Sequence, residues 1–353
     1  MQLNFEIANE TFMAYEKPMF IAEISANHNK SIENTIKLID EAHKAGADGI
    51  KLQTFTPETI TFNSTGEKYR VSGNAWEGNT LHELYEKAYM PWDDQEKIIN
   101  YCRRKGIICF STPFDFSAVD FLIDADVPAF KIASSELVDL PLIKAAARHN
   151  KPLIISTGMG NRDEIQQAVD AVRSINPKLQ ICLLKCTAEY PANGEDANLG
   201  VLKSDFTKFG CAIGLSDHTI GSVVPIVAAI NGAVIFEKHI TLSRGLGGID
   251  SHFSSEPHEF ASMISDVKMA LAANKNKGID FITPGEANSR KYRKSLICVK
   301  KIRPHEVLTA ENIAILRPAI GLSPKHYEKV LGKSAKRQIQ PGDPITWDDL
   351  NLD

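Results

Sequence analysis

The sequence predicts an α/β protein built from a (β/α)8 barrel (a TIM barrel) and a small β-rich domain after it. Two observations predict the barrel. Over roughly the first 275 of 353 residues, eight short apolar runs alternate with amphipathic segments, and nearly every run ends in polar or ionisable residues. A third observation predicts the second domain, because the last sixty or so residues carry short β-like runs between proline turns.

The eight apolar runs have the length of buried strands. They are Met19–Ile24, Gly49–Gln53, Ile107–Ser111, Ala129–Ala133, Leu153–Thr157, Ile181–Cys186, Cys211–Leu215 and Ala233–His239. Eight such units of this length favour a closed parallel barrel. An open doubly wound sheet is the alternative, but no G-x-G-x-x-G turn supports it.

The segments between these runs have helical character. Ser31 and Asp115 are plausible helix starts, while Gly46 and Gly106 are plausible stops. The expected helices are Ser31–Ala45, Asp93–Lys105, Phe116–Ala125, Leu140–His149, Arg162–Ser174, Leu199–Phe206, Gly221–Asn231 and Pro257–Ala273.

The chain is longer than a single hydrophobic core usually supports, so two domains are expected. Residues 276–294 are polar and basic, as is typical of a linker. We therefore expect a barrel domain over residues 1–275, a linker over 276–294 and a small domain over 295–353. In that small domain, Leu296–Val299 and Ala314–Leu316 read as strands.

Composition excludes several function classes. A net charge of −4 and a pI near 6.2 give no electrostatic reason to expect nucleic acid or an anionic membrane as a partner. Val223–Ile230 is far shorter than the roughly 20 residues of a membrane helix. Met1–Tyr15 does not resemble a secretory signal. Six cysteines in a chain this long favour reduced thiols, so we expect a cytoplasmic protein.

Polar residues gather where the predicted strands end, and this is where barrel enzymes carry their catalytic groups. Random placement would scatter them over both ends of the strands, so an enzyme is favoured over a non-catalytic binding protein. The strand-end residues are Glu23, Asn27, His28, Lys51, Gln53, Thr112, Lys131, Ser134, Glu136, Ser156, Lys185, Thr187, Tyr190, Ser216, His218, Glu237 and His239.

His218 and His239 follow consecutive strands, so their side chains can converge on a metal. Imidazole suits Mn²⁺, Co²⁺, Fe²⁺ or Zn²⁺, whereas Mg²⁺ prefers carboxylate and water. Two protein ligands would leave positions open for water and substrate, as a catalytic metal needs. The alternative is that both histidines lie in the core with their hydrogen bonds made inside the protein. The nearby Glu237 and Asp250 favour the metal site over this alternative.

Lys51 and Lys131 point into the same mouth as several hydroxyls. Amines and hydroxyls together suit a small phosphorylated or carboxylated anion. A lysine that forms a Schiff base, as in aldolases, is the alternative. The hydroxyl residues are Thr112, Ser134, Ser156 and Ser216.

Glu23 and Glu136 are candidates for proton transfer, with a structural ion pair to a lysine as the alternative for each. The long connection Phe55–Trp92 is rich in aromatic residues. Such an insert on the catalytic face is either a substrate-binding lid or a cover for the barrel rim.

Taken together, these motifs resemble the sialic acid synthase family, in order along essentially the whole chain. In the barrel the matching motifs are A-E-I-S-A-N-H-N (Ala22–Asn29), K-L-Q-T (Lys51–Thr54), S-T-P-F (Ser111–Phe114), K-I-A-S-S-E (Lys131–Glu136), S-T-G-M (Ser156–Met159), K-C-T-A-E-Y-P (Lys185–Pro191), G-L-S-D-H-T (Gly214–Thr219), E-K-H-I (Glu237–Ile240) and G-G-I-D (Gly247–Asp250). R-K-S-L (Arg293–Leu296), L-R-P-A-I-G-L (Leu316–Leu322) and V-L-G-K (Val330–Lys333) resemble the antifreeze-like (SAF) domain of these synthases.

Three stretches look most like the pseudaminic acid synthases of this family: Leu81–Trp92, Lys185–Ala192 and Gly247–Phe260. The resemblance implies condensation of phosphoenolpyruvate with 2,4-diacetamido-2,4,6-trideoxy-altrose and water, giving pseudaminic acid and phosphate. N-acetylneuraminate or legionaminate synthesis, with the same chemistry on another amino sugar, is the alternative that the resemblance leaves open.

The resemblance also implies roles for individual residues. Phosphoenolpyruvate would be held by Lys51, Thr112, Lys131, Ser134, Ser156 and Ser216. A divalent metal, Mn²⁺ or Mg²⁺ with Co²⁺ possible, would be held by His218 and His239. The sugar and the reacting water would be faced by Glu23, Gln53, Tyr190 and Asp250.

Arg317 of the small domain would reach the sugar in the barrel of a partner subunit, since family members are domain-swapped homodimers. Three positions depart from the family pattern. Ala188 stands where many members have asparagine, Ala319 where glycine usually follows Arg-Pro, and Ser25-Ala26 where Gly-x is common. None of these removes a proposed lysine or metal ligand.

Overall fold

The structure is a computed structural model that describes residues 4–72, 76–275 and 282–351. The chain forms two compact units, Met1–Lys275 and Asn276–Asp353, which are described separately here. Within the described residues, none of the helices combines the length and the apolar character needed to cross a bilayer.

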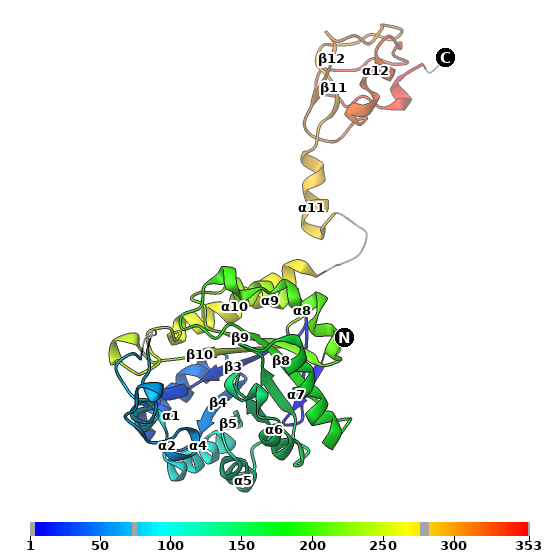
Figure 1. The fold of residues 1–353 in the computed structure, drawn as a ribbon. Helices are drawn as coiled ribbons and strands as arrows, with labels where there is room; N and C mark the ends of the chain where they lie inside the picture. The colour runs from blue at the N-terminus through cyan, green and yellow to red at the C-terminus, as the bar shows by residue number, and fades with distance from the viewer. Residues whose placement is uncertain (1–3, 73–75, 276–281, 352–353) are drawn as a thin grey trace. The chain divides into compact units, whose positions relative to one another are not determined.

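Eight parallel strands close into a barrel in the first unit, which confirms the predicted fold class (Figure 1). Around the barrel, β10 pairs with β3 and with β9, so the first and last strands of the barrel meet. The strands are β3 (Met19–Glu23), β4 (Gly49–Thr54), β5 (Ile108–Pro113), β6 (Phe130–Ile132), β7 (Leu153–Ser156), β8 (Ile181–Cys186), β9 (Ala212–Asp217) and β10 (Ile235–His239).

Helices follow the strands and surround the barrel (Figure 1). Their ends follow from local sequence: the Ser31 side chain accepts from the Asn34 amide at the first helix start, and Gly106 takes a left-handed conformation where another helix stops. The helices are α1 (Ile32–Lys44), α4 (Trp92–Lys105), α5 (Phe116–Asp124), α6 (Leu140–Ala147), α7 (Arg162–Ile175), α8 (Gly200–Ser204), α9 (Val223–Ile230) and α10 (Pro257–Asn274).

An N-terminal hairpin was not predicted. It consists of β1 (Asn4–Ile7) and β2 (Glu10–Met13), which pair antiparallel. Phe5 and Phe12 are fully buried in the barrel's core cluster. Ala8 and Glu10 line a cavity together with residues at the start of β5, so the hairpin lies at the amino ends of the strands. The opposite, carboxyl end is therefore left for the catalytic mouth.

The long connection after β4 folds into α2 (Pro57–Ile60), a 3-10 turn (Glu67–Tyr69) and α3 (Leu81–Ala88). Phe55 from its start is buried and packs edge-on against Tyr85 of α3 and against Phe114 after β5. The insert is thus anchored to the carboxyl ends of the strands through aromatic contacts.

The second unit contains α11 (Pro284–Ser289), β11 (Ser295–Cys298), β12 (Ile313–Leu316) and α12 (Tyr327–Val330). The two strands pair antiparallel, close to the runs expected from the sequence. They pack on a hydrophobic cluster that belongs to this unit alone. The segment 276–294, expected to be a linker, includes α11, while its residues 276–281 lie outside the described part.

Candidate active site

The carboxyl ends of the barrel strands enclose a cavity of about 250 Å³. Polar groups from seven of the eight strands or the turns after them line it, and the insert contributes an apolar side. The lining includes Ser25, Lys51, Gln53, Phe55, Trp76, Leu84, Tyr85, Lys131, Ser134, Ser156, Cys186, Tyr190, Ser216, His218, Glu237, His239, Asp250 and Phe253.

A buried network of two amines and two carboxylates forms the floor of this cavity. Lys51 Nζ lies 3.0 Å from Glu23 Oε2 and 3.0 Å from Glu237 Oε1. Lys131 Nζ lies 3.9 Å from Glu237 Oε2 and donates to Ser156 Oγ at 2.6 Å. The two predicted anion-binding lysines are therefore brought together, with Glu237 between them.

Burial shifts the protonation of this network. It raises the pKa of Glu23 to about 7, with Glu237 adding to the rise and Lys51 opposing it. Burial also lowers the pKa of Lys131 to about 8, although Glu237 opposes this shift. Burial would lower the pKa of Lys51 too, but the adjacent carboxylates outweigh it and raise that pKa. Glu23 is thus poised to take or give a proton near neutral pH.

Hydroxyl groups surround the lysines as predicted. Ser216 Oγ donates to Glu237 Oε1 at 3.2 Å, and Ser134 Oγ accepts from the Gly158 amide at 3.1 Å. Thr112 is fully buried, and its Oγ1 has no hydrogen-bond partner among the described residues. A buried hydroxyl without a partner is costly unless a ligand engages it.

His218 and His239 face each other across the cavity, with ring centroids 5.3 Å apart. Nδ1 of His218 lies 2.8 Å from the Thr187 carbonyl oxygen. Because a carbonyl can only accept, this nitrogen carries the proton and leaves Nε2 as a free electron-pair donor. Among the described residues, the buried Nδ1 of His239 has no hydrogen-bond partner, and burial together with nearby cations holds the pKa of His239 well below the usual range.

In their neutral forms, two imidazoles in one cavity are the donor set that a divalent transition metal prefers. Burial lowers the pKa of His218, but Cys186 and the Thr187 carbonyl outweigh burial and raise that pKa, so a metal would bind there in competition with a proton. Across residues 4–72, 76–275 and 282–351, no cluster of three or more His, Cys, Asp or Glu side chains is arranged to hold a metal ion. The residues present therefore fit an ion with two protein ligands and several positions left for water or substrate oxygen.

Aromatic rings from the insert and from the turns after β8 and β10 form one wall of the cavity. Tyr190 packs on His218 with centroids 4.3 Å apart and on Trp76 at 5.4 Å. Trp76 Nε1 donates to the Ile249 carbonyl oxygen at 3.2 Å, which ties the insert to the G-G-I-D turn. Apolar rings beside polar tips are typical of carbohydrate-binding surfaces, where they pack against the C–H face of a sugar.

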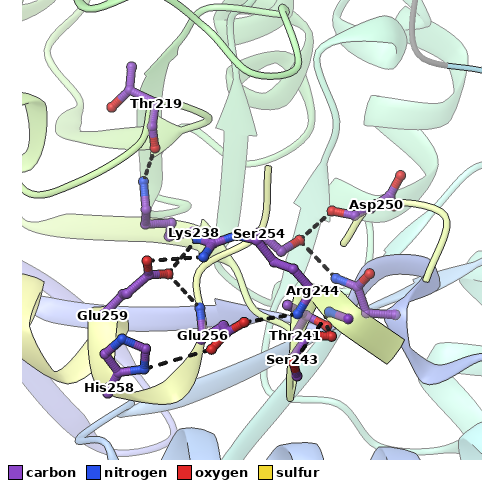
Figure 2. Close-up of polar contacts among 12 residues, drawn as sticks. Thr219, Lys238, Thr241, Ser243, Arg244, Asp250, Ser254, Glu256, His258 and Glu259 are labelled. Carbon is purple, nitrogen blue, oxygen red and sulfur yellow. Dashed lines mark hydrogen bonds and ion pairs between the residues drawn. The ribbon is translucent and has the colours of Figure 1, made fainter. Parts of the chain in front are cut away.

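Asp250 lies in this wall, and burial raises its pKa while the Ser25 hydroxyl and the Ala26 amide oppose that rise. Its turn is tied to the barrel: Ser254 Oγ donates to the Asp250 carbonyl oxygen at 2.6 Å (Figure 2). The same close-up shows the ion pair between Arg244 and Glu259, which fixes the start of the connection between β10 and α10 to α10 itself.

Four predicted site residues do not line the cavity. Glu23, which contacts Lys51 and Gln53, and Thr112 are fully buried outside the lining. Glu136 lies in the turn after β6, where its Oε2 accepts from Ser135 Oγ at 2.8 Å, and burial raises its pKa. Arg317 belongs to the second unit, directly after β12, and is exposed. The roles of Glu136 and Arg317 stay predictions.

Sequence reasoning placed Glu237 among the strand-end residues without giving it a role in the site, and it left Ser25 out. Strand alternation could have found Glu237, because Glu237 and His239 are two apart in β10 and point the same way. Lys238 points oppositely and pairs with Asp217 at 2.5 Å. Ser25 gives no such signal, because its role depends on a turn conformation.

Comparisons with known proteins agree with this geometry. Residues 38–278 match the NeuB family, and residues 293–351 match the SAF domain. The pseudaminic acid synthase of Helicobacter pylori is 38% identical over 95% of this chain and 98% of its own length. The N,N'-diacetyllegionaminic acid synthase of Campylobacter jejuni is 34% identical over 94% of this chain and 99% of its own length.

A solved structure also matches the whole chain. The spore coat polysaccharide biosynthesis protein SpsE of Bacillus subtilis superimposes with a TM-score of 0.66 at 31% identity, covering 99% of each chain. The family match spans more than half of the sequence, and the relatives are similar nearly end to end. The chain therefore belongs to the NeuB family, as its resemblance to sialic acid synthases implied, and carries a SAF domain at its C-terminus.

Proposed function

We propose that this protein condenses phosphoenolpyruvate with 2,4-diacetamido-2,4,6-trideoxy-altrose and water, giving pseudaminic acid and phosphate. One observation carries the proposal. A single cavity joins a lysine-rich floor, two facing imidazoles and an aromatic wall, in a chain 38% identical to pseudaminic acid synthases over nearly its full length.

The floor supplies the site for phosphoenolpyruvate. Lys51 and Lys131 would offset the negative charge of its phosphate and carboxylate groups. These groups would then take the place that Glu237 holds as the partner of both amines. The hydroxyls of Thr112, Ser156 and Ser216 would donate hydrogen bonds in a water-poor setting. Because Glu237 keeps both amines charged before the substrate arrives, the floor is organised in advance.

The imidazoles of His218 and His239 would hold a divalent ion, Mn²⁺ or Mg²⁺, with Co²⁺ as a further candidate. Polarisation of the sugar aldehyde oxygen is the chemistry that such an ion supplies when bound. The lone pair left on His218 and the unpartnered nitrogen of His239 support this assignment. Metal analysis of wild type and His239→Ala, each stripped with chelator and then dialysed against Mn²⁺, tests it, and equal metal content in the two proteins would contradict it.

The bond changes balance as follows. C3 of phosphoenolpyruvate forms a bond to the aldehyde carbon, whose oxygen takes a proton and becomes a hydroxyl. Water adds to C2 and loses a proton, for which Glu23 and Asp250 are the candidate acceptors. The C2–O bond to phosphate then breaks and phosphate leaves with the electron pair. The C2 hydroxyl gives up its remaining proton, which the departing phosphate takes, and C2 becomes the keto carbon.

Phosphate release from the purified protein with each candidate sugar tests the substrate. We expect turnover with 2,4-diacetamido-2,4,6-trideoxy-altrose. Turnover only with N-acetylmannosamine would instead identify an N-acetylneuraminate synthase. Turnover only with the legionaminate precursor would identify a legionaminate synthase, the activity named for the Campylobacter jejuni relative that is 34% identical.

A Schiff-base aldolase is the second class of enzyme to test, because Lys131 has a pKa near 8 and could serve as a nucleophile. Its amine already donates to Ser156 and to the Ile132 carbonyl oxygen, which argues against that role. Borohydride trapping with substrate would label a lysine in an aldolase and leave a condensing synthase unlabelled.

The proposal extends to assembly and location. Arg317 would reach the sugar in the partner's barrel of a domain-swapped homodimer, as the family resemblance implies. A cytoplasmic location is supported by the six cysteines, all of which are free and buried, as in proteins of reducing compartments. Molar mass in solution tests the dimer, and cell fractionation tests the location.

A further inference from the structure

Ser25 has an unusual backbone conformation in the wall of the cavity. Its φ angle is +49°, in the left-handed region, and only 5% of the residue is exposed. Glycine adopts this conformation without steric penalty, whereas a side chain at the same position is strained. A strained side chain at a ligand cavity indicates that the side chain itself has a use.

The Ser25 hydroxyl connects two polar groups of the cavity. It donates to Asp250 Oδ2, and it accepts from Gln53 Nε2 at 3.4 Å. The same Gln53 nitrogen donates its other proton to Glu23 Oε1 at 2.9 Å. A one-way chain of hydrogen bonds therefore runs from Gln53 to Glu23 on one side and through Ser25 to Asp250 on the other.

The backbone of the Asp250 turn is fixed independently of Ser25. Ser254 Oγ donates to the Asp250 carbonyl oxygen and accepts from Asn27 Nδ2 at 2.8 Å (Figure 2). A Cβ on Gly248 would lie 2.7 Å from Asn27 Oδ1, so this turn packs closely on the residues after β3. Removing the Ser25 hydroxyl should therefore leave the turn in place.

The Asp250 carboxylate has a different anchor from its backbone. Among the described residues, its hydrogen-bond donors are the Ser25 hydroxyl and the Ala26 amide, the latter at a long 3.4 Å. Without the hydroxyl, this buried carboxylate would keep one weak donor and could rotate within the cavity.

We propose that Ser25 is a positioning residue that fixes the carboxylate of Asp250, and with it Gln53, as one polar wall that the amino sugar contacts. This inference rests on the proposed function, because it assigns the wall to the sugar. Among the hydrogen bonds of the described residues, the Ser25 hydroxyl has none to Lys51 or Lys131, so the phosphoenolpyruvate floor should not depend on that hydroxyl.

Two substitutions separate the hydroxyl from the backbone strain. Ser25→Gly removes the hydroxyl and relieves the strain, whereas Ser25→Ala removes the hydroxyl and keeps it. Both variants should raise the KM for the sugar roughly tenfold or more, as expected for loss of a hydrogen bond to a charged group, with the KM for phosphoenolpyruvate unchanged. The melting temperature should be equal to or above wild type for Ser25→Gly and lower for Ser25→Ala.

Ala8→Gly is the matched control, because Ala8 also has a positive φ, +53°, but lies in the hairpin at the opposite end of the barrel. It should match wild type in both KM values. A wild-type sugar KM in Ser25→Gly would overturn the inference, even if Ser25→Ala were impaired, since strain and not the hydroxyl would then matter.

Coupling to Asp250 gives a readout that a purely structural role would not change. If Ser25 acts through Asp250, the effects of Ser25→Gly and Asp250→Asn on the sugar KM should not add in the double variant. Additive effects would overturn the inference. Absence of phosphate release by the wild type with every sugar would overturn the proposed function and this inference with it, whereas an active wild type with an unaffected Ser25→Gly overturns this inference alone.

Discussion

The floor and the wall of the cavity are built differently. The floor consists of strand residues, Lys51, Lys131 and Glu237, which are fixed by barrel pairing and by one another. Apart from Gln53 of β4, the wall consists of residues from turns and from the insert, among them Trp76 and Asp250, which are fixed by hydrogen bonds between segments. Chemistry common to the family would thus sit on the rigid barrel, and sugar selection on parts that can vary without disturbing it.

The largest effect is expected on the floor. Lys131→Met keeps the length of the side chain but removes the charge that offsets the departing phosphate, so kcat should fall by about 10²–10³-fold, in the range seen for loss of one preorganised electrostatic donor. Steady-state phosphate release checks this. Lys151→Met is the control, because Lys151 lies away from the cavity, forms an ion pair with the exposed Asp126, and should keep full activity when that pair is lost.

The proposed domain swap predicts complementation between two inactive variants. Co-expressed Lys131→Met and Arg317→Ala chains should form mixed dimers that regain part of the wild-type rate, because one of their barrels would be intact and would receive an intact arginine. Tandem affinity purification with two tags isolates the mixed dimer for assay. No recovery in that dimer would place Arg317 with its own barrel or outside the site.

The stability of the barrel domain should respond to pH through His28, which lies in the turn after β3. This buried residue accepts from the Lys30 amide and contacts the Ala88 carbonyl at the end of α3, and burial lowers its pKa from 6.5 to about 4. As pH falls, His28 takes up a proton in the unfolded chain at a higher pH than in the folded chain. Its contribution to the free energy of unfolding is therefore complete above pH 6.5, and up to about 3 kcal/mol is lost as pH falls toward 4.

Denaturant titrations between pH 4 and 7.5 measure that loss. His28→Gln should flatten the pH dependence, while His43→Gln, on the exposed side of α1, should leave it unchanged. A wild-type pH dependence in the His28 variant would show that other groups produce it.

A smaller effect is expected from the aromatic part of the wall. Trp76→Ala removes a ring that lines the cavity beside Tyr190. The KM for the sugar should therefore rise about tenfold, which corresponds to a loss of roughly 1–2 kcal/mol of binding free energy, as is usual for a contact residue. The KM for phosphoenolpyruvate should not change. Phe62→Ala, in the same insert but 72% exposed, is the control. Equal rises in both KM values would contradict the separation of floor and wall.

The two parts also differed in how far the sequence revealed them. Strand periodicity located the floor. In a chain of repeated strand-helix units, a buried apolar run with a polar end has few structural interpretations other than a barrel strand. The wall depends on turns, whose geometry short sequence patterns do not determine. Ser25 is an example, since its position between Gln53 and Asp250 follows from a positive φ that serine rarely adopts.

Two elements outside the site were missed for different reasons. The hairpin β1–β2 has strands of four residues each, too short for alternation to be decisive. The helix α11 lies in a segment read as a linker from its polar composition. A capping signal was nevertheless present, because Thr283 and Glu286 form a capping box with Pro284 at the first helical position.

The fate of the bridging oxygen of phosphoenolpyruvate tests the central claim, that the lysine floor holds a phosphate leaving with the C2–O electron pair. Phosphoenolpyruvate labelled with ¹⁸O at that oxygen would be incubated with the enzyme and 2,4-diacetamido-2,4,6-trideoxy-altrose, and the released phosphate analysed by mass spectrometry. We predict that the phosphate retains the label. Unlabelled phosphate would contradict the account, because the P–O bond would then have broken and water would not have been added at C2.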